Sequence, residues 1–418
     1  MIKGVIFAVE NVIAPMEATK EKLIRNPNFL ELLKLFGFLQ SRGVTPTIMT
    51  NRPWNFKRGG GSLKTYLEEQ LGFEVNWFDG KSGMPSKPYA SSSGWVREQL
   101  GLETREVIYV GSTTSDMRTA VNGKMLFLNA HWFKEVSHYG FDFKTPRDLG
   151  RFIDLFCFRD RAWFFDVEAE GLRVLSLAPY STRVEEYEKY TRDAQAALKH
   201  IGTGGHPDFW LRYLITSLYI SGLHESVQYV TTYPGHSPDS STPALSHDDL
   251  DTFAKCFRIT HLKDLIVRHH KATKSSYARA RGQTLDHSNQ LNTIRLRSDP
   301  MRTNGSRFRN NPIKPGKTVL ILDDICTEGN SLDSARALVQ KLGADALLVS
   351  CLKTINRNYD LLDDQKLGNF DPFQENRFSS EQVQVKRSFD YSAHISDRTA
   401  PGDLLEKLKI YDEWDWPG

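Results

Sequence analysis

Short apolar runs alternate with amphipathic segments along the first 160 residues of this 418-residue chain. The apolar runs predict strands at residues 5–7, 45–50, 107–110 and 125–128. The amphipathic segments predict helices at residues 29–39, 63–71 and 93–100. This alternation predicts a parallel sheet with helices on both faces, in which ligands bind at the carboxyl ends of the strands. The residues that follow each apolar run are therefore the candidates for chemistry.

The remainder of the chain has the same α/β pattern. Apolar runs predict strands at residues 163–167, 172–177, 227–230, 319–322 and 346–350. Amphipathic segments predict helices at residues 184–201, 209–223, 248–258, 332–342 and 401–410. Residues 262–268 fit a strand or a helix, and the polar stretch 356–396 fits irregular structure or a sheet edge. Thr145-Pro146 opens a capped helix shortly before a boundary near Arg159, so we expect two doubly wound α/β domains, residues 1–160 and 161–418.

The stretch from Lys317 to Ser331 carries the clearest chemical pattern. A buried strand leads to two adjacent carboxylates, Asp323 and Asp324, and a short loop with glycine then leads into a helix. A helix N-terminus offers free backbone N–H groups and a positive dipole end, which suit a phosphate. Carboxylates suit the hydroxyls of a sugar, or water around a magnesium ion. The combination predicts a sugar-phosphate site; the alternative is an ordinary strand–turn–helix with the acid pair in the turn.

This stretch resembles the phosphoribosyl diphosphate motif of type I phosphoribosyltransferases, where Asp-Asp and two residues precede Thr-Thr-Gly-x-Thr. The last five residues of the motif are here Thr327, Glu328, Gly329, Asn330 and Ser331. The resemblance implies that Asp323 and Asp324 orient the ribose of phosphoribosyl diphosphate, that residues 327–331 hold its 5′-phosphate, and that Mg²⁺ accompanies it. Because Glu328 replaces a Thr, its carboxylate must turn away before its N–H group can reach a phosphate.

Two further segments resemble parts of this family. The loop after the 227–230 strand grips the diphosphate in type I transferases; here it contains Tyr233, Gly235 and His236, and a plain surface turn is the alternative. The region before the motif resembles that of competence-type, amidotransferase-like phosphoribosyltransferases. The resemblance implies a basic hood that compensates the charge of the leaving diphosphate and excludes water. Its catalytic group would be Lys274, Arg279 and Arg281, with a solvated charged face as the alternative.

The first domain resembles the haloacid dehalogenase (HAD) superfamily of phosphatases and phosphomutases. Those enzymes carry a nucleophilic Asp and, two residues later, an acid–base Asp after the first strand, where this chain has Ala8 and Glu10. Residues matching the later motifs are Thr50, Lys87 and Asp116. Ser112 replaces a metal-binding Asp. Because an aspartyl-phosphate intermediate needs a carboxylate nucleophile, we expect a catalytically degenerate domain with a scaffold, regulatory or partner-binding role.

Composition narrows the class of protein. Hydrophobic residues make up 39% of the chain and charged residues 25%, which is ordinary for a soluble globular protein. No apolar run approaches the length of a membrane span and no signal-peptide layout is present, so we expect a cytoplasmic protein without a membrane partner. The four cysteines have no CxxC spacing, so neither a zinc site nor a disulfide framework is indicated.

Positive charge is concentrated ahead of the sugar-phosphate motif. Residues 258–317 hold fourteen Lys or Arg and four His against three Asp, although the net charge of the chain is only +3. A solvated face and nucleic-acid binding are the usual interpretations of such a run. Base-stacking aromatics are not interleaved in it, so we expect a loop that closes over a polyphosphate rather than a nucleic-acid partner.

Two functions follow from these patterns. The first is a phosphoribosyltransferase that transfers ribose 5-phosphate to an unidentified base or amine. The second is a non-catalytic sensor of phosphoribosyl diphosphate or a nucleotide, a regulator or partner-binding protein in a stress or defence system. Glu328, the unusual diphosphate loop and the disabled first domain favour the sensor somewhat, and Ala8 and Ser112 oppose a phosphohydrolase. A protein partner or a homo-oligomer is compatible with both.

Overall fold

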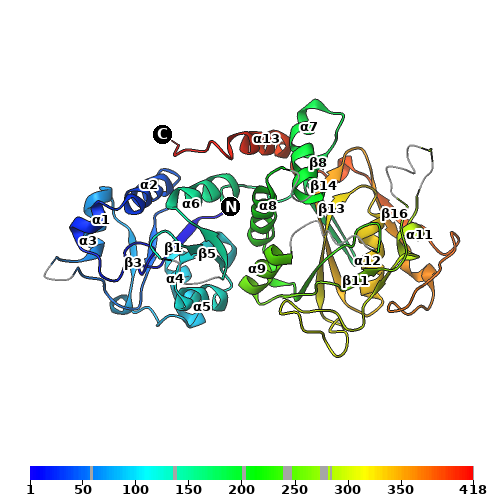
Figure 1. Ribbon diagram of the computed structural model, residues 1–418, viewed down its shortest axis with the longest axis horizontal. Helices are drawn as coiled ribbons and strands as arrows, with labels where there is room; N and C mark the ends of the chain where they lie inside the picture. The colour runs from blue at the N-terminus through cyan, green and yellow to red at the C-terminus, as the bar shows by residue number, and fades with distance from the viewer. Residues whose placement is uncertain are drawn as a thin grey trace.

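Figure 1 shows a computed structural model in which two α/β units lie side by side, the N-terminal one in blue to teal. The structure describes residues 1–56, 60–134, 139–199, 204–238, 247–273, 281–282 and 285–417. Each unit is a sheet covered by helices, so the predicted α/β class is confirmed. None of the described helices combines the length and the apolar character that crossing a membrane requires.

The first sheet has six described strands, all parallel, in the order β3-β2-β1-β4-β5-β6. The strands are β1 (Gly4–Phe7), β2 (Thr47–Met49), β3 (Asn76–Phe78), β4 (Val107–Gly111), β5 (Leu126–Ala130) and β6 (Phe141–Phe143). The helices are α1 (Lys20–Ile24), α2 (Pro27–Ser41), α3 (Leu63–Leu71), α4 (Ala90–Leu100), α5 (Thr114–Asn122) and α6 (Pro146–Phe152). The central strands β1 and β4 are fully buried, which agrees with their continuous apolar runs.

The second sheet has the order β10-β9-β13-β14-β8-β7, with β7 antiparallel to β8 and the other pairs parallel. The strands are β7 (Phe165–Ala169), β8 (Leu172–Tyr180), β9 (Tyr229–Thr232), β10 (Thr260–His261), β13 (Thr318–Cys326) and β14 (Asp345–Thr354). The helices of this unit are α7 (Glu185–Ala194), α8 (Pro207–Ile220), α9 (His247–Phe257), α11 (Ser288–Leu291), α12 (Asn330–Gln340) and α13 (Ala400–Ile410). The long strands β13 and β14 therefore lie at the centre of the sheet.

Two small antiparallel sheets lie in segments whose structure the sequence left open. Residues 262–268, predicted as one element, supply only β11 (Ile266–Arg268), which pairs with β12 (Ile294–Leu296). The polar stretch 356–396 is not wholly irregular, because β15 (Tyr359–Leu362) pairs with β16 (Val385–Phe389). β15 has only four residues, of which Tyr359, Leu361 and Leu362 are buried, and so short an apolar run is not distinctive within a polar stretch.

The C-terminal tail joins the two units. After α13, the indole N–H of Trp414 donates to Asp154 at 2.9 Å and that of Trp416 donates to Glu31 of α2 at 2.7 Å. Arg151 of α6 donates to the Tyr411 carbonyl at 2.9 Å. A side chain at Gly150 would meet the Trp416 ring at 2.5 Å, so the close packing of the tail requires glycine there. The tail thus covers the α2–α6 face of the first unit.

A second contact between the units is made by α8. The Tyr219 hydroxyl lies 2.6 Å from the Thr104 carbonyl oxygen and 2.5 Å from that of Val107, at the start of β4. The buried Arg159 guanidinium bonds to the Phe156 carbonyl at 3.0 Å and to Ser217 of α8 at 2.9 Å. These buried hydrogen bonds cross the junction, which favours one fixed arrangement of the units.

Candidate functional site

The acid pair lies within the end of the central strand β13 rather than beyond it. The strand continues to Cys326 because β14 pairs with it as far as Lys353. Asp323 Oδ1 accepts the N–H of Asp324 at 2.8 Å, and Asp324 Oδ1 accepts the N–H of Ile325 at 2.7 Å. Each carboxylate is partly buried and lies near the carboxyl end of the strand, which is the edge where ligands of such sheets bind.

The loop after β13 turns through Gly329 into α12. Gly329 has a φ of +92°, a backbone conformation that other residues rarely adopt. A Cβ atom there would also lie 2.4 Å from the Tyr359 ring. Glycine is therefore required both by the backbone conformation and by the space available. Gly329 is the N-cap of α12 and provides no side-chain cap, which leaves the first turn of the helix without the usual Ser, Thr or Asp partner. Asn330 and Ser331 begin the helix.

The Glu328 side chain in this loop has a charged partner. Its carboxylate pairs with the Arg357 guanidinium at 3.2 Å, and its backbone carbonyl accepts the N–H of Asp360 at 2.9 Å. The position that departs from the transferase motif therefore has its negative charge partly neutralised by a neighbouring cation. The Glu328 carboxylate is thus engaged by Arg357.

Lys353, which sequence reasoning did not identify, contacts the backbone of the same loop. Its ammonium donates to the carbonyl of Thr327 and, at 2.6 Å, to that of Arg357. The residue is fully buried, and burial lowers the pKa of its ammonium. A lysine at the end of a core strand is the only signal that the sequence offered. Its role is to hold the loop by backbone contacts, and Thr327 is further tied to Thr354 by a 3.1 Å hydroxyl contact.

A buried charged network fixes α12 behind the loop. Asp333 accepts hydrogen bonds from Arg336 at 2.5 Å and from the Leu362 N–H at 2.7 Å, and Arg336 also pairs with Asp364. Burial raises the pKa of the Asp333 carboxyl, but the Arg336 guanidinium and His287 together outweigh burial, and the net pKa lies below the ordinary value. The network anchors the helix to β15 and is structural support for the candidate site.

The predicted diphosphate loop follows β9, beside the acid pair. The Tyr233 N–H donates to the Leu322 carbonyl at 2.8 Å, so the loop begins next to Asp323. The Tyr233 ring is buried, and its hydroxyl donates to Gln290 at 2.7 Å. Burial raises the pKa of this hydroxyl to about 12. Arg268 donates to the Gly235 carbonyl, and the His236 carbonyl accepts the Ala272 N–H at 2.9 Å.

The predicted basic group is described only in part. Arg281 is exposed, whereas Lys274 and Arg279 lie outside the described residues. Of the neighbouring segment, Leu285 is close to the motif, because its carbonyl accepts a hydrogen bond from the Asn330 side chain at 2.9 Å. The structure thus brings the acid pair, the 327–331 loop and the Tyr233 loop together at one sheet edge, with the chain that follows the basic segment beside them.

The HAD-like positions meet at the carboxyl edge of the first sheet. Ala8 is buried after β1, Glu10 lies two residues on, and the Thr50 hydroxyl is turned to the Arg52 carbonyl at 3.0 Å. Lys87 and Asp116 form an ion pair of 2.6 Å whose side chains are 8% and 3% exposed. The structure therefore brings these motif positions together without a carboxylate at position 8.

Asp116 is saturated by protein groups. Besides Lys87, it accepts hydrogen bonds from the N–H groups of Ser112 at 3.2 Å and Thr113 at 3.0 Å, and from the Thr113 hydroxyl at 2.8 Å. Burial raises its pKa, but Lys87 and Thr113 outweigh burial, and the net pKa is lowered. Mg²⁺ needs several oxygen ligands that are free to coordinate it. With Ala8 and Ser112 in place of carboxylates and Asp116 fully engaged, these residues do not fit the metal.

Comparison with known proteins gives a partial likeness. No protein-family model matches the chain, and no curated protein matches it. Three similar solved structures are a HAD-superfamily hydrolase from Geobacter sulfurreducens, a putative phosphoglycolate phosphatase from Lactobacillus delbrueckii subsp. bulgaricus and a HAD-superfamily hydrolase from Ehrlichia chaffeensis. Their sequence identities are 16%, 23% and 15%, and their TM-scores are 0.25, 0.25 and 0.27.

These likenesses cover 37%, 29% and 37% of this chain, and 100%, 52% and 96% of the three solved chains, respectively. At such identities and TM-scores they do not bear on activity or substrate, and they cover well under half of the chain. Two of these three solved proteins are named as HAD-superfamily hydrolases and the third as a putative phosphoglycolate phosphatase.

Proposed function

We propose that the second unit binds phosphoribosyl diphosphate with Mg²⁺ and transfers ribose 5-phosphate to a nitrogen nucleophile, a base or an amine. The observation that carries the proposal is the placement of Asp323 and Asp324 on the carboxyl end of β13, directly before a loop that enters α12 through Gly329. Carboxylates suit ribose hydroxyls, and a helix N-terminus suits a phosphate. The two carboxylates and the start of the helix lie within one stretch of nine residues, 323–331.

Each part of the site has a role in this proposal. Asp323 and Asp324 orient the ribose and would hold the magnesium ion, either directly or through its water. The backbone of residues 327–331 receives the 5′-phosphate, and the pairing of Glu328 with Arg357 offsets part of the carboxylate charge beside it. When bound, Mg²⁺ neutralises part of the charge of the diphosphate. Lys353 holds the loop in shape through the Thr327 carbonyl.

One observation favours a second candidate, a non-catalytic sensor of the same ligand or of a nucleotide. The Tyr233 hydroxyl is engaged with Gln290 and lies 3.2 Å from the Arg268 guanidinium, so this side chain is committed to the fold of its loop. A loop whose ring side chain is buried offers the leaving diphosphate its backbone groups and His236 only. Such a loop is better suited to holding a ligand than to stabilising a transition state.

Binding is tested by calorimetric titration of the full chain with phosphoribosyl diphosphate and Mg²⁺. The double variant Asp323→Asn/Asp324→Asn keeps the size of both side chains and removes their charge, so we expect affinity to fall by about tenfold or more. The matched control is Asp345→Asn, an exposed carboxylate at the opposite end of β14. Equal binding by the double variant and the wild type would refute both the transferase and the sensor.

Turnover is tested separately, by diphosphate release across a panel of bases and amines. The transferase proposal expects release with at least one acceptor, at a rate that the double Asn variant lowers. Binding without release under any acceptor would reject the transferase and support the sensor. The transferase and the sensor share the binding step, and only the transferase releases diphosphate. The release assay therefore separates the two proposals.

A further inference from the structure

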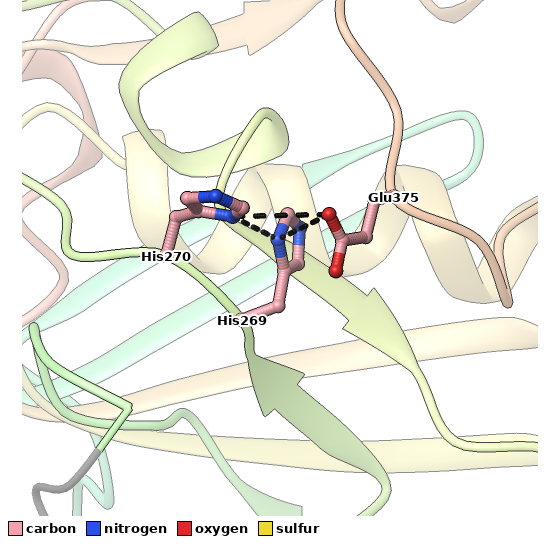
Figure 2. Close-up of side chains that lie close together, drawn as sticks. All are labelled: His269, His270 and Glu375. Atoms are coloured by element: carbon pink, nitrogen blue, oxygen red, sulfur yellow. Dashed lines mark hydrogen bonds and ion pairs between the residues drawn. The ribbon is translucent and has the colours of Figure 1, made fainter.

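A cluster of two histidines and a glutamate lies apart from the acid pair. His269 and His270 follow β11 directly, and Glu375 comes from a turn about a hundred residues later. Figure 2 shows the three side chains converging, with one nitrogen of each ring and one carboxylate oxygen facing a common point. These ligand atoms all lie within 4.8 Å of one another, and this is the one such group of three or more His, Cys, Asp or Glu found among the described residues.

The contacts within the cluster do not satisfy all of its members. His269 Nδ1 and His270 Nδ1 are 2.6 Å apart, so a single hydrogen can be shared between them. Glu375 Oε2 lies 3.6 Å from the first nitrogen and 3.9 Å from the second, which is beyond a hydrogen bond. The other nitrogen of His269, Nε2, is buried and has no hydrogen-bond partner within the described ranges. Nδ1 is therefore the ring nitrogen of His269 that makes polar contacts, and it faces His270 and Glu375.

The three residues are held by their backbones. The N–H of His269 donates to the Thr293 carbonyl at 2.9 Å, and the His269 side chain is 7% exposed, so one ligand is fixed. The turn that carries Glu375 is closed by bonds to Asp371 from the N–H groups of Phe373 at 2.9 Å and Gln374 at 3.2 Å. The His270 and Glu375 side chains are 60% and 58% exposed and are free to adjust by rotation.

We propose that His269, His270 and Glu375 form a binding site for a divalent transition-metal ion of the zinc class. Two imidazoles and one carboxylate are a ligand set that zinc uses, with solvent in the remaining position. Zn–N and Zn–O bonds of about 2.0–2.1 Å in a tetrahedral site place ligand atoms about 3.3 Å apart. The two observed separations to Glu375 are slightly above this value and the separation of the rings is below it, so a small rotation of His270 suffices.

The charges around the site are mixed. Glu375 supplies the negative charge of the cluster, whereas the neighbouring Arg295 and Arg268 are positively charged. The same arginines oppose a bound cation, so the site is expected to hold zinc less tightly than a site of full carboxylate and thiolate character.

The ion would connect two segments that frame the candidate site. Arg268, the residue before His269, donates to the Gln290 side chain at 2.9 Å and to the Gly235 carbonyl in the Tyr233 loop. The turn with Glu375 is joined to β12 by the Leu296 N–H, which donates to the Pro372 carbonyl at 2.7 Å. A metal that links His269, His270 and Glu375 thus clamps the end of β11 to this turn. The clamp is a structural role, and it stands whether or not the transferase proposal holds.

The test is a zinc titration of the full chain after removal of its affinity tag and of bound metal by a chelator. We expect one zinc ion per chain in the wild type, and an affinity that falls by about tenfold or more in His270→Ala and in Glu375→Gln. Both replaced side chains are exposed, so the fold is retained. The matched control is Glu381→Gln, an exposed carboxylate of the same segment, which leaves zinc binding unchanged.

Hydrogen exchange with and without zinc gives a readout that does not depend on activity. Peptides covering residues 266–270 and 371–376 gain protection with zinc in the wild type and in the control, but not in the two ligand variants. The proposal is overturned by the absence of stoichiometric zinc binding in the wild type. It is equally overturned by binding that both ligand variants retain, since the ion then lies elsewhere.

Discussion

Replacing Lys87 by Met removes the ammonium that faces the buried Asp116 carboxylate while keeping the length of the side chain. The two charges are 2.6 Å apart, and at an effective dielectric constant of about 20 they attract by about 6 kcal/mol. The cost of burying the ammonium offsets part of this attraction. Breaking a buried pair by removing one partner typically costs about 3–5 kcal/mol, because a charge is left uncompensated. Asp116 keeps four other hydrogen bonds, from the Tyr109 hydroxyl, the Ser112 N–H and the N–H and hydroxyl of Thr113, so we expect about 3 kcal/mol at pH 7.

The pH dependence gives the prediction its second test. In the wild type the pKa of Asp116 is lowered, so its contribution to stability is present above the unfolded pKa and is lost as the pH falls through the folded value. Without Lys87 the effect of burial is less opposed and the folded pKa rises. The carboxylate then protonates at a higher pH, and the loss of stability relative to the wild type shrinks between pH 7 and pH 4.5.

Urea unfolding followed by circular dichroism at both pH values measures the loss, and hydrogen exchange of peptides from β4 and α5 places it in the first unit. The matched control is Lys64→Met, which breaks a 3.7 Å pair with Glu68 whose lysine is 43% exposed; it should cost under about 0.5 kcal/mol. The double variant Lys87→Met/Asp116→Asn should regain part of the loss. A loss below about 1 kcal/mol at pH 7, or an equal loss at both pH values, would refute the reasoning.

Three further predictions concern the second unit and the tail. Gly329→Ala places a methyl group against the Tyr359 ring at a φ of +92°, so it should lower the unfolding midpoint in urea by the equivalent of about 2 kcal/mol or more and weaken phosphoribosyl diphosphate binding, measured by calorimetry. Glu328→Thr restores the motif residue and removes a carboxylate from the loop, so it should tighten that binding; unchanged or weaker binding would contradict the role given to the loop. Burial lowers the pKa of His206, but its contacts with Asp412 and Asp193 outweigh burial, so the net pKa is raised and the stabilising charge is lost as the pH rises through that folded value. Proteolysis within the tail should therefore accelerate as the pH is raised from 6 to 9, and His206→Gln should remove this dependence.

The central strands of both sheets could be predicted because their apolar runs are continuous. The edge strands β3 and β6 could not, since each has three residues and is only partly buried. The end of β13 was placed too early for a related reason. Polar residues normally end a buried strand, but here Asp323 pairs with Ser350 of β14 and the ladder carries on past the acid pair. The end of β13 is thus set by its pairing with β14 and not by the polarity of its own residues.

The acid pair and its loop were visible in the sequence because their residues are neighbours along the chain. The residues that shape them are not. Lys353 is 26 positions from the carbonyl of Thr327, and Lys87 is 29 positions from Asp116. Adjacent histidines carry no signal until Glu375 is folded against them. Contacts of this kind form only when segments far apart in the sequence pack together in the folded chain. The spacing of residues along the chain therefore cannot reveal them.

The docking of the tail on the first unit has a consequence for synthesis of the chain. Domains fold as they leave the ribosome, the N-terminal one first. Trp414 and Trp416, which cover the α2–α6 face, are made only after the whole second sheet. The first unit therefore waits, with that face exposed to water and to chaperones, until translation has passed residue 416.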